Sequence, residues 1–174
     1  MPDERTANLL GALALSLIDS LDAVVEANAG YGGETPAALV TLGAEPGLSI
    51  NQLRQILNLS HPGTVRLIDR LAAEGLVERR SGADGRTLAL FLTEAGLERR
   101  QNILSERRQP LQQAIEGLTS TERQQLAQLL EKMLSGMTTS PSKAFAICRL
   151  CEEEVCPSDR CPVEQQYCQM MNHE

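Results

Sequence analysis

Residues 49–75 contain two consecutive helix start signals, and this stretch limits the possible folds more than any other part of the chain. Ser49 and Gln52 form a capping box, in which each side chain satisfies a free backbone N–H group at the start of a helix. Ser60 follows as a second N-cap, and Gly75 provides a stop signal. Two short helices joined by a three-residue turn are typical of a helix-turn-helix. The sequence therefore predicts this motif.

The second of these helices has two chemically different sides. Its apolar residues recur at three- and four-residue steps, which predicts a buried stripe of Val65, Ile68, Leu71 and Ala72. The opposite side and the first turn carry polar and small residues, namely Ser60, His61, Pro62, Thr64, Arg66 and Arg70. The N-terminal turn of a recognition helix is the part that reaches base edges in DNA. An ordinary solvated helix face is the alternative interpretation.

The hydrophobic period changes from helical to alternating after Gly75. Leu76 and Val77 begin an expected strand, SGADG reads as a turn, and residues 87–92 read as the returning strand. Long amphipathic helices are expected on both sides, over residues 8–28, from Thr93 to about residue 117, and from a second capping region at residues 119–122 to about residue 136. The predicted fold class is mainly α with a small β-hairpin.

Composition is consistent with packed helices. Hydrophobic residues make up 42% of the 174 residues, but aromatic residues make up only 2% and tryptophan is absent. The core must therefore consist of aliphatic side chains, which suit helix packing better than a β-sandwich.

The order of these elements, with LTEAG after the hairpin, resembles the MarR family of bacterial transcriptional regulators. The resemblance covers residues 8–137 and is most specific over the 49 residues from Leu48 to Gly96. It implies a homodimeric winged helix-turn-helix protein that binds double-stranded DNA at a pseudo-palindromic operator, usually as a repressor. It also implies a dimerisation helix at residues 1–30, a DNA-binding domain at 34–93 and further dimerisation helices at 94–137. Family members are often controlled by a small-molecule effector, whose identity the sequence leaves open.

The resemblance also gives roles to individual residues. Arg66 is the best candidate for a bidentate contact to guanine. The hairpin tip Asp84-Gly85-Arg86 resembles the family's D-x-R wing, in which Arg86 would enter the minor groove while Asp84 holds its guanidinium. Arg79 and Arg80 at the hairpin base are expected to contact phosphates. The predicted DNA contacts are Ser49, Ser60, His61, Pro62, Thr64, Arg66, Arg70, Arg79, Arg80, Asp84 and Arg86.

Charge is distributed unevenly, although the net charge is −7. Residues 54–108 carry ten arginines against seven acidic residues, a balance of +3, and the other parts of the chain are net acidic. A winged-helix module that binds proteins instead of DNA is therefore the alternative of another class. No cluster of side chains suggests catalysis, so we expect no enzyme. The N-terminal apolar run contains Ser16 and Asp19, so we expect no signal peptide, no membrane span and a cytoplasmic location.

All five cysteines lie in the last 27 residues. Cys148, Cys151, Cys156 and Cys161 are separated by two, four and four residues, and Cys168 follows. A C-x-x-C pair places two thiolates on one side of a turn, as a tetrahedral metal requires. The segment from residue 141 to 174 is therefore expected to be a cysteine-rich extension with a metal site. Cys168 is an alternative fourth ligand.

Several kinds of chemistry suit this cysteine segment. Structural zinc bound by four cysteines is the favoured interpretation, because soft ligands cluster in a reducing compartment. An iron–sulfur cluster would make the protein a redox or iron sensor. A thiol–disulfide switch is a third interpretation, although the three acidic residues of CEEEVC would raise the thiol pKa values. Thiols without any ligand or switching role are the fourth.

Overall fold

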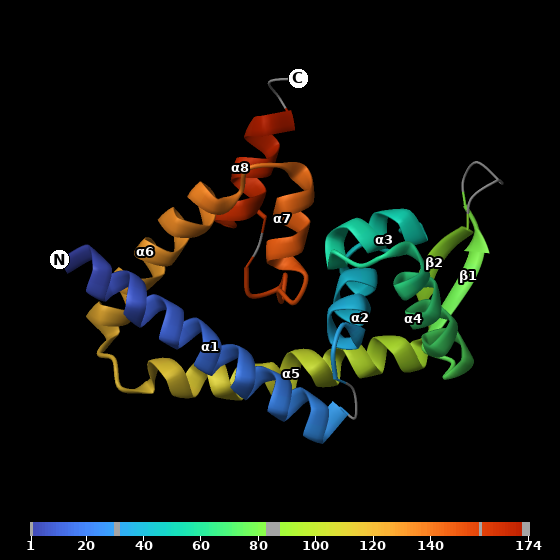
Figure 1. Ribbon diagram of the computed structural model, residues 1–174, viewed down its shortest axis with the longest axis horizontal. Helices are drawn as coiled ribbons and strands as arrows, with labels where there is room; N and C mark the ends of the chain where they lie inside the picture. The colour runs from blue at the N-terminus through green and yellow to red at the C-terminus, as the bar shows by residue number, and fades with distance from the viewer. Residues whose placement is uncertain (1, 30–31, 83–87, 157, 172–174) are drawn as a thin grey trace.

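The computed structural model describes residues 2–29, 32–82, 88–156 and 158–171. The elements in chain order are α1 (Pro2–Ala29), α2 (Thr35–Ala44), α3 (Ile50–Leu57), α4 (His61–Ala73), β1 (Val77–Ser81), β2 (Leu88–Leu92), α5 (Glu94–Glu116), α6 (Ser120–Met137), α7 (Pro141–Cys148) and α8 (Pro162–Met171) (Figure 1). The expected fold class, mainly α with one small β-hairpin, is confirmed.

The capping signals in the sequence are the actual helix starts. Ser49 and Gln52 form a complete capping box at the start of α3, and the Ser60 hydroxyl accepts the Gly63 N–H at the start of α4. Asn58 ends α3 in the left-handed conformation, with φ of 54°, and so makes the tight turn between these helices. The helix-turn-helix predicted from residues 49–75 is therefore present.

The hairpin after α4 is joined by a third extended segment. Strands β1 and β2 are antiparallel, with Val77 opposite Leu92 and Ser81 opposite Leu88. On the free edge of β2, the Leu90 carbonyl accepts the Gly47 N–H and the Leu90 N–H donates to the Leu48 carbonyl, both at 2.9 Å. The residues before α3 therefore fix the hairpin against the helix-turn-helix.

Helix α2 is the centre of the hydrophobic core. All of its residues from Thr35 to Leu42 are buried, and helices α3, α4 and α5 and the hairpin pack around it. Its fully buried neighbours are aliphatic, as the composition predicted, and include Leu53, Ile68, Leu71, Leu90 and Ile103.

Helix α1 lies along α5, and the chain turns back through α6 toward the C-terminal segment (Figure 1). Much of α1 is exposed, including Leu9, Leu10, Leu13, Leu15 and Ile18. Residues Asp3–Ala27 are long and apolar enough to cross a membrane, with a mean hydropathy of 1.6, and are the one such helix in the part of the chain that is described. Core helices of soluble proteins and signal sequences pass the same test, so length and composition alone do not indicate a span.

The cysteine segment is more regular than the sequence suggested. The Ser140 hydroxyl accepts the Lys143 N–H and so caps a helix, α7 starts at Pro141, and only three residues separate it from α6. Helix α7 packs against α3, and α8 packs against both α6 and α7. The segment therefore lies against the folded domain (Figure 1).

Candidate nucleic-acid interface and candidate metal centre

Helix α4 has a buried side and an exposed side. Leu67, Ile68 and Leu71 are buried against the core, whereas Val65 and Ala72, both expected in the buried stripe, are only half-buried. Arg66 is exposed, and in the described part of the chain no acidic side chain pairs with its guanidinium. His61 and Pro62 are also exposed, in the first turn next to the Ser60 cap. This end of α4 therefore presents the His61 side chain and the Arg66 guanidinium to the surface.

The structure corrects the prediction for Thr64. This residue has no exposed surface, and its hydroxyl donates to the Ser60 carbonyl at 3.1 Å. Because the hydroxyl forms a hydrogen bond inside its own helix, burial of Thr64 leaves no unpaired polar group. Thr64 therefore takes the core position that Val65 was expected to occupy. A DNA contact from Thr64 is not compatible with this position.

The other predicted arginines have partners within the chain. Arg70 donates to the buried Thr35 hydroxyl on α2. Arg79 pairs with Asp69 of α4, and Arg80 pairs with Glu78 and lies over the Phe91 ring, 4.6 Å from its centroid. The side chains are partly exposed, so these ion pairs contribute little to stability. They fix the direction of the arginines along the base of the hairpin.

Ser49, Asp84 and Arg86 are the remaining residues that the sequence predicted to contact DNA. The Ser49 hydroxyl accepts the Gln52 N–H at 3.3 Å and donates to the Gln52 side chain at 2.8 Å, so it serves as a cap. Asp84 and Arg86, at the tip of the hairpin, lie outside the described residues.

Four of the five thiols converge at one place. Cys148 ends α7, the Cys151 N–H donates to the Cys148 carbonyl at 2.7 Å, and Cys161 directly precedes α8. The Cys148 thiol donates a hydrogen bond to Cys151, and the Cys156 thiol bonds to both Cys151 and Cys161. The C-x-x-C turn and the two later cysteines therefore form one connected thiol cluster.

The thiols of this cluster have unequal acidity. The hydrogen bond from Cys148 lowers the pKa of Cys151 to about 6, and the Arg107 guanidinium of α5 acts in the same direction. The pKa of Cys148 is raised, first because its thiol donates that bond and then by burial. Burial and the neighbouring Cys161 raise the pKa of Cys156 to about 11. Cys151 is therefore set to be a thiolate near neutral pH.

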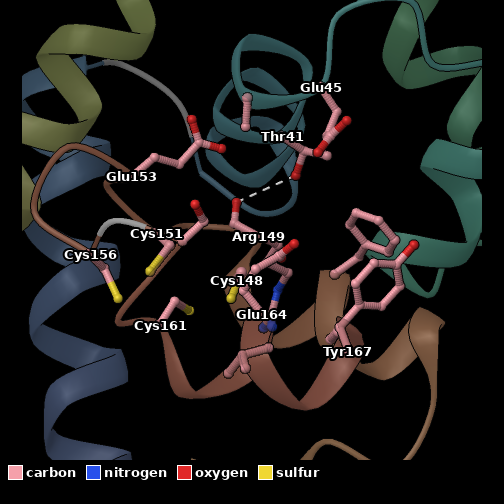
Figure 2. A pocket seen from close by; sticks show the side chains of 15 residues that line it. Thr41, Glu45, Cys148, Arg149, Cys151, Glu153, Cys156, Cys161, Glu164 and Tyr167 are labelled. Atoms are coloured by element: carbon pink, nitrogen blue, oxygen red, sulfur yellow. Dashed lines mark hydrogen bonds between the residues drawn. The ribbon is translucent and has the colours of Figure 1, made fainter. Parts of the chain in front are cut away.

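A cavity of about 490 Å³ lies between α2 and the cysteine segment (Figure 2). The four thiols lie toward one end of it and Tyr167 toward the other. Three carboxylates line it as well, and burial raises the pKa of Glu45, which Glu153 and Glu164 raise further. The cavity therefore combines soft sulfur donors with a negative lining.

Cys168 is not part of this cluster. It is exposed on α8, its thiol donates to the Glu164 carboxylate at 3.8 Å, and it does not line the cavity. In the described ranges, no three His, Cys, Asp or Glu side chains already surround one point closely enough to hold a metal ion. A tetrahedral zinc site requires sulfur atoms about 3.8 Å apart, from Zn–S distances of about 2.3 Å. The four clustered thiols would therefore have to close together around an ion.

Sequence reasoning missed the residues that attach the cysteine segment to the domain. The Thr41 hydroxyl of α2 donates to the Arg149 carbonyl at 3.4 Å, and Arg108 of α5 pairs with Glu152 at 2.6 Å. Arg107 is half-buried, and burial lowers the pKa of its guanidinium while Cys151 opposes that effect. The polar run around Arg107 and Arg108 was the only available signal, and it did not identify their partners.

Comparisons with known proteins agree with this geometry. The model of the MarR family matches residues 30–87. The transcriptional repressor MprA of Escherichia coli is 38% identical over 101 residues, which are 56% of this chain and 57% of that protein. The chain therefore matches little more than half of this curated relative's length. The named relatives are regulators and not enzymes, in agreement with the sequence-based expectation.

Solved structures share the fold over most of the chain. A MarR family protein from Bacillus stearothermophilus has a TM-score of 0.72 at 22% identity, covering 79% of this chain and 96% of that one. A variant of MepR from Staphylococcus aureus, solved bound to an oligodeoxyribonucleotide, has a TM-score of 0.56 at 23% identity, covering 75% and 96%. The resemblance drawn from residues 48–96 is thereby confirmed: residues 30–87 match the MarR family model, and the chain shares the winged-helix fold of MarR-family structures and carries a cysteine-rich C-terminal segment.

Proposed function

We propose that this protein is a DNA-binding transcriptional repressor that acts as a homodimer on a pseudo-palindromic operator in the bacterial cytoplasm. The observation that carries the proposal is the unpaired, exposed Arg66 on the outer side of α4, beside a capped helix start. The similarity to the repressor MprA and the oligonucleotide bound to a MepR variant of the same fold support it.

The residues divide into base-reading and phosphate-binding groups. Arg66 reads guanine, while His61, Pro62 and the Ser60 cap form the helix end that lies against the DNA. Arg79, Arg80 and Ser49 lie at the base of the hairpin and on its neighbouring edge, where they meet phosphates. Arg70 is held by Thr35, so it serves as a positioned phosphate contact. Asp84 and Arg86 are the residues proposed, from the family resemblance, for contact with the minor groove.

Replacing Arg66 with alanine is expected to weaken operator binding about 5- to 150-fold, because loss of a bidentate base contact removes roughly 1–3 kcal/mol. Binding to unrelated DNA should change much less. Fluorescence anisotropy with the DNA upstream of the protein's own gene and with a scrambled duplex, over a range of salt concentrations, measures both.

Two further variants make this experiment specific. Arg66→Lys keeps the charge but loses the two-pronged donor geometry, so it should lose selectivity while keeping the salt dependence. Lys143→Gln removes an exposed positive charge from α7 and should bind like the unchanged protein. If the unchanged protein shows no salt-dependent binding to its upstream DNA, the alternative of a protein-binding module replaces this proposal.

The homodimer is supported by apolar surface that one chain leaves uncovered. Helix α1 exposes several leucines, and α6 exposes Leu129, Leu130, Met133 and Met137. Exposed apolar surface of this extent on two long helices is typical of a protein–protein interface. A second copy of the chain would cover both helices in the arrangement that the family resemblance implies.

We further propose that Cys148, Cys151, Cys156 and Cys161 bind one metal ion, with zinc as the favoured metal. The donor set fits, because four soft ligands already form one hydrogen-bonded cluster. The half-buried Arg107 beside Cys151 fits as well, because it offsets part of the negative charge of four thiolates around a divalent ion.

Protein purified without air is expected to contain about one zinc per chain by elemental analysis. Cys151→Ser should lower zinc affinity by at least about 100-fold, since even second-shell partners are worth 10- to 100-fold. Cys168→Ser is the matched control and should keep full metal content, because its thiol lies outside the cluster. Iron with visible absorption would favour the iron–sulfur alternative, and the absence of both metals would contradict a metal site.

A further inference from the structure

The cysteine segment is attached to the winged-helix domain on one side. Phe145 and Leu150 pack against the main hydrophobic core, and the Thr41 hydroxyl of α2 donates to the Arg149 carbonyl at 3.4 Å. Arg108 of α5 pairs with Glu152 at 2.6 Å, between Cys151 and Cys156. The first two cysteines are therefore connected to α2 and α5.

The other side of the segment is attached to α6. A small second core contains Ala144, Cys161 and Val163, and Leu134 of α6 packs against it. The Ser135 hydroxyl donates to the Gln166 side chain at 3.3 Å. The last clustered cysteine, Cys161, is therefore connected to α6 through α8. The thiol cluster lies where the domain and the proposed dimer helix meet.

A metal ion held by all four thiols would join these two attachments. Its metal–sulfur bonds would link the C-x-x-C turn to Cys161 across the cluster. Cys148 is the last residue of α7, which packs against α3, the first helix of the helix-turn-helix. The bound ion would therefore connect α3 on one side to α6 on the other.

We propose that this four-cysteine site is a sensor for a thiophilic metal ion, and that its occupancy sets the position of the helix-turn-helix relative to α6. This inference rests on the proposed DNA-binding function and the proposed metal site. The metal-bound form binds the operator more tightly, because a fixed helix-turn-helix loses less conformational freedom when it binds DNA. The cavity beside the thiols gives the ion a path to the site, as a sensor needs.

The test compares operator affinity of the full chain after removal of metal by a chelator and after addition of one equivalent of Zn²⁺. We expect the zinc-loaded protein to bind at least about tenfold more tightly, within the usual range of coupling between two sites. A change below about twofold, with zinc bound at one per chain, would overturn the proposal, and so would weaker binding of the zinc-loaded form.

A double variant separates coupling from metal binding. Thr41→Val with Arg108→Gln removes the hydrogen bond from α2 and the ion pair from α5 to the segment, but no thiol. It should still take up one zinc per chain, while the affinity difference between the two forms falls to less than about threefold. Lys143→Gln, on the exposed side of α7, should keep the full difference. If the double variant also keeps the full difference in operator affinity between the metal-free and zinc-loaded forms, these two links do not couple the metal site to DNA binding, and the proposal fails.

The possible failures are distinguishable from one another. Absence of operator binding in both forms overturns the DNA-binding function, and absence of zinc uptake overturns the metal site. Either result also removes the sensor. If the protein binds DNA and takes up zinc normally, but zinc does not change its operator affinity, only the sensor proposal is overturned.

Discussion

A chain in which Leu10 and Leu13 are both replaced by glutamate is expected to be a monomer at concentrations where the unchanged protein is a dimer. These side chains are 44% and 49% exposed in a single chain. Burying this exposed surface against the second chain of the dimer contributes about 1 kcal/mol for each side chain. Because the dimer has two-fold symmetry, each substitution occurs twice in the interface. Each carboxylate buried there raises the free-energy cost of dimerisation by a further several kcal/mol. The dissociation constant of the dimer should rise by at least about 10⁵-fold, as sedimentation velocity would measure.

The control for this experiment is Ala12→Glu, which adds the same charge about 100° around the helix from Leu13. It should reduce dimerisation much less. Operator affinity should fall together with dimer content in the leucine variant, because a monomer reads one half-site. Binding of α1 to lipid vesicles, with no change of oligomeric state in the variant, would contradict the dimer and favour a membrane role for this apolar helix.

Gly96→Ala is expected to destabilise the folded chain by about 3 kcal/mol, at the upper end of the usual range for overpacking. A Cβ atom at this position would lie 2.1 Å from the Leu76 carbonyl oxygen and 3.2 Å from Leu92. The first of these atoms is backbone, and it already accepts the Thr93 N–H, so it cannot move without breaking the junction between the hairpin and α5. The melting temperature should fall by about 6–12 °C, as differential scanning calorimetry would measure.

Gly117→Ala is the matched control for that substitution. Gly117 has an ordinary φ of −70°, and no atom lies within 4 Å of its added Cβ. Alanine should therefore be neutral or stabilise the protein by up to about 1 kcal/mol, since it restricts the unfolded chain. If Gly96→Ala melts within about 2 °C of the unchanged protein, the close contact with Leu76 does not constrain the fold.

Local signals in the sequence predicted most of the winged-helix domain. Ser49, Ser60, Thr93 and Thr119 each cap a helix, and all four caps act within three residues of the chain. Such interactions depend on short-range order, so a single sequence is sufficient to find them. The hairpin was predictable for the same reason, from a change of hydrophobic period.

Interactions between distant residues could not be predicted in this way. Thr64 reads as a polar surface residue until its hydroxyl is seen to bond within its own helix. The Arg70 contact joins residues 35 positions apart, and the Arg108 contact joins residues 44 apart. An arginine has many acceptable partners, and its choice depends on tertiary packing that no local pattern encodes.

The cysteine segment is an intermediate case. Its spacing predicted a metal site of four cysteines with Cys168 as an alternative ligand; the structure places the first four cysteines at one cavity and Cys168 outside it, and their metal binding stays a prediction. The helices α7 and α8 were not predicted, because each is only 8 or 10 residues long and the cysteine pattern drew attention to loops. The polar run around Arg107 did not identify its partner, since Arg107 lies beside a thiol more than 40 residues later in the chain.

Phe145 and Leu150 pack against the same interior as Leu53 and Ile68. Residues 141–171 are therefore a structural part of the winged-helix domain, and their removal would expose apolar core to water. The shortest piece of this chain that keeps its native interior has to include the cysteines. The proposed DNA-binding surface and the thiol cluster then belong to one cooperative folding unit, so the stability of each depends on the other.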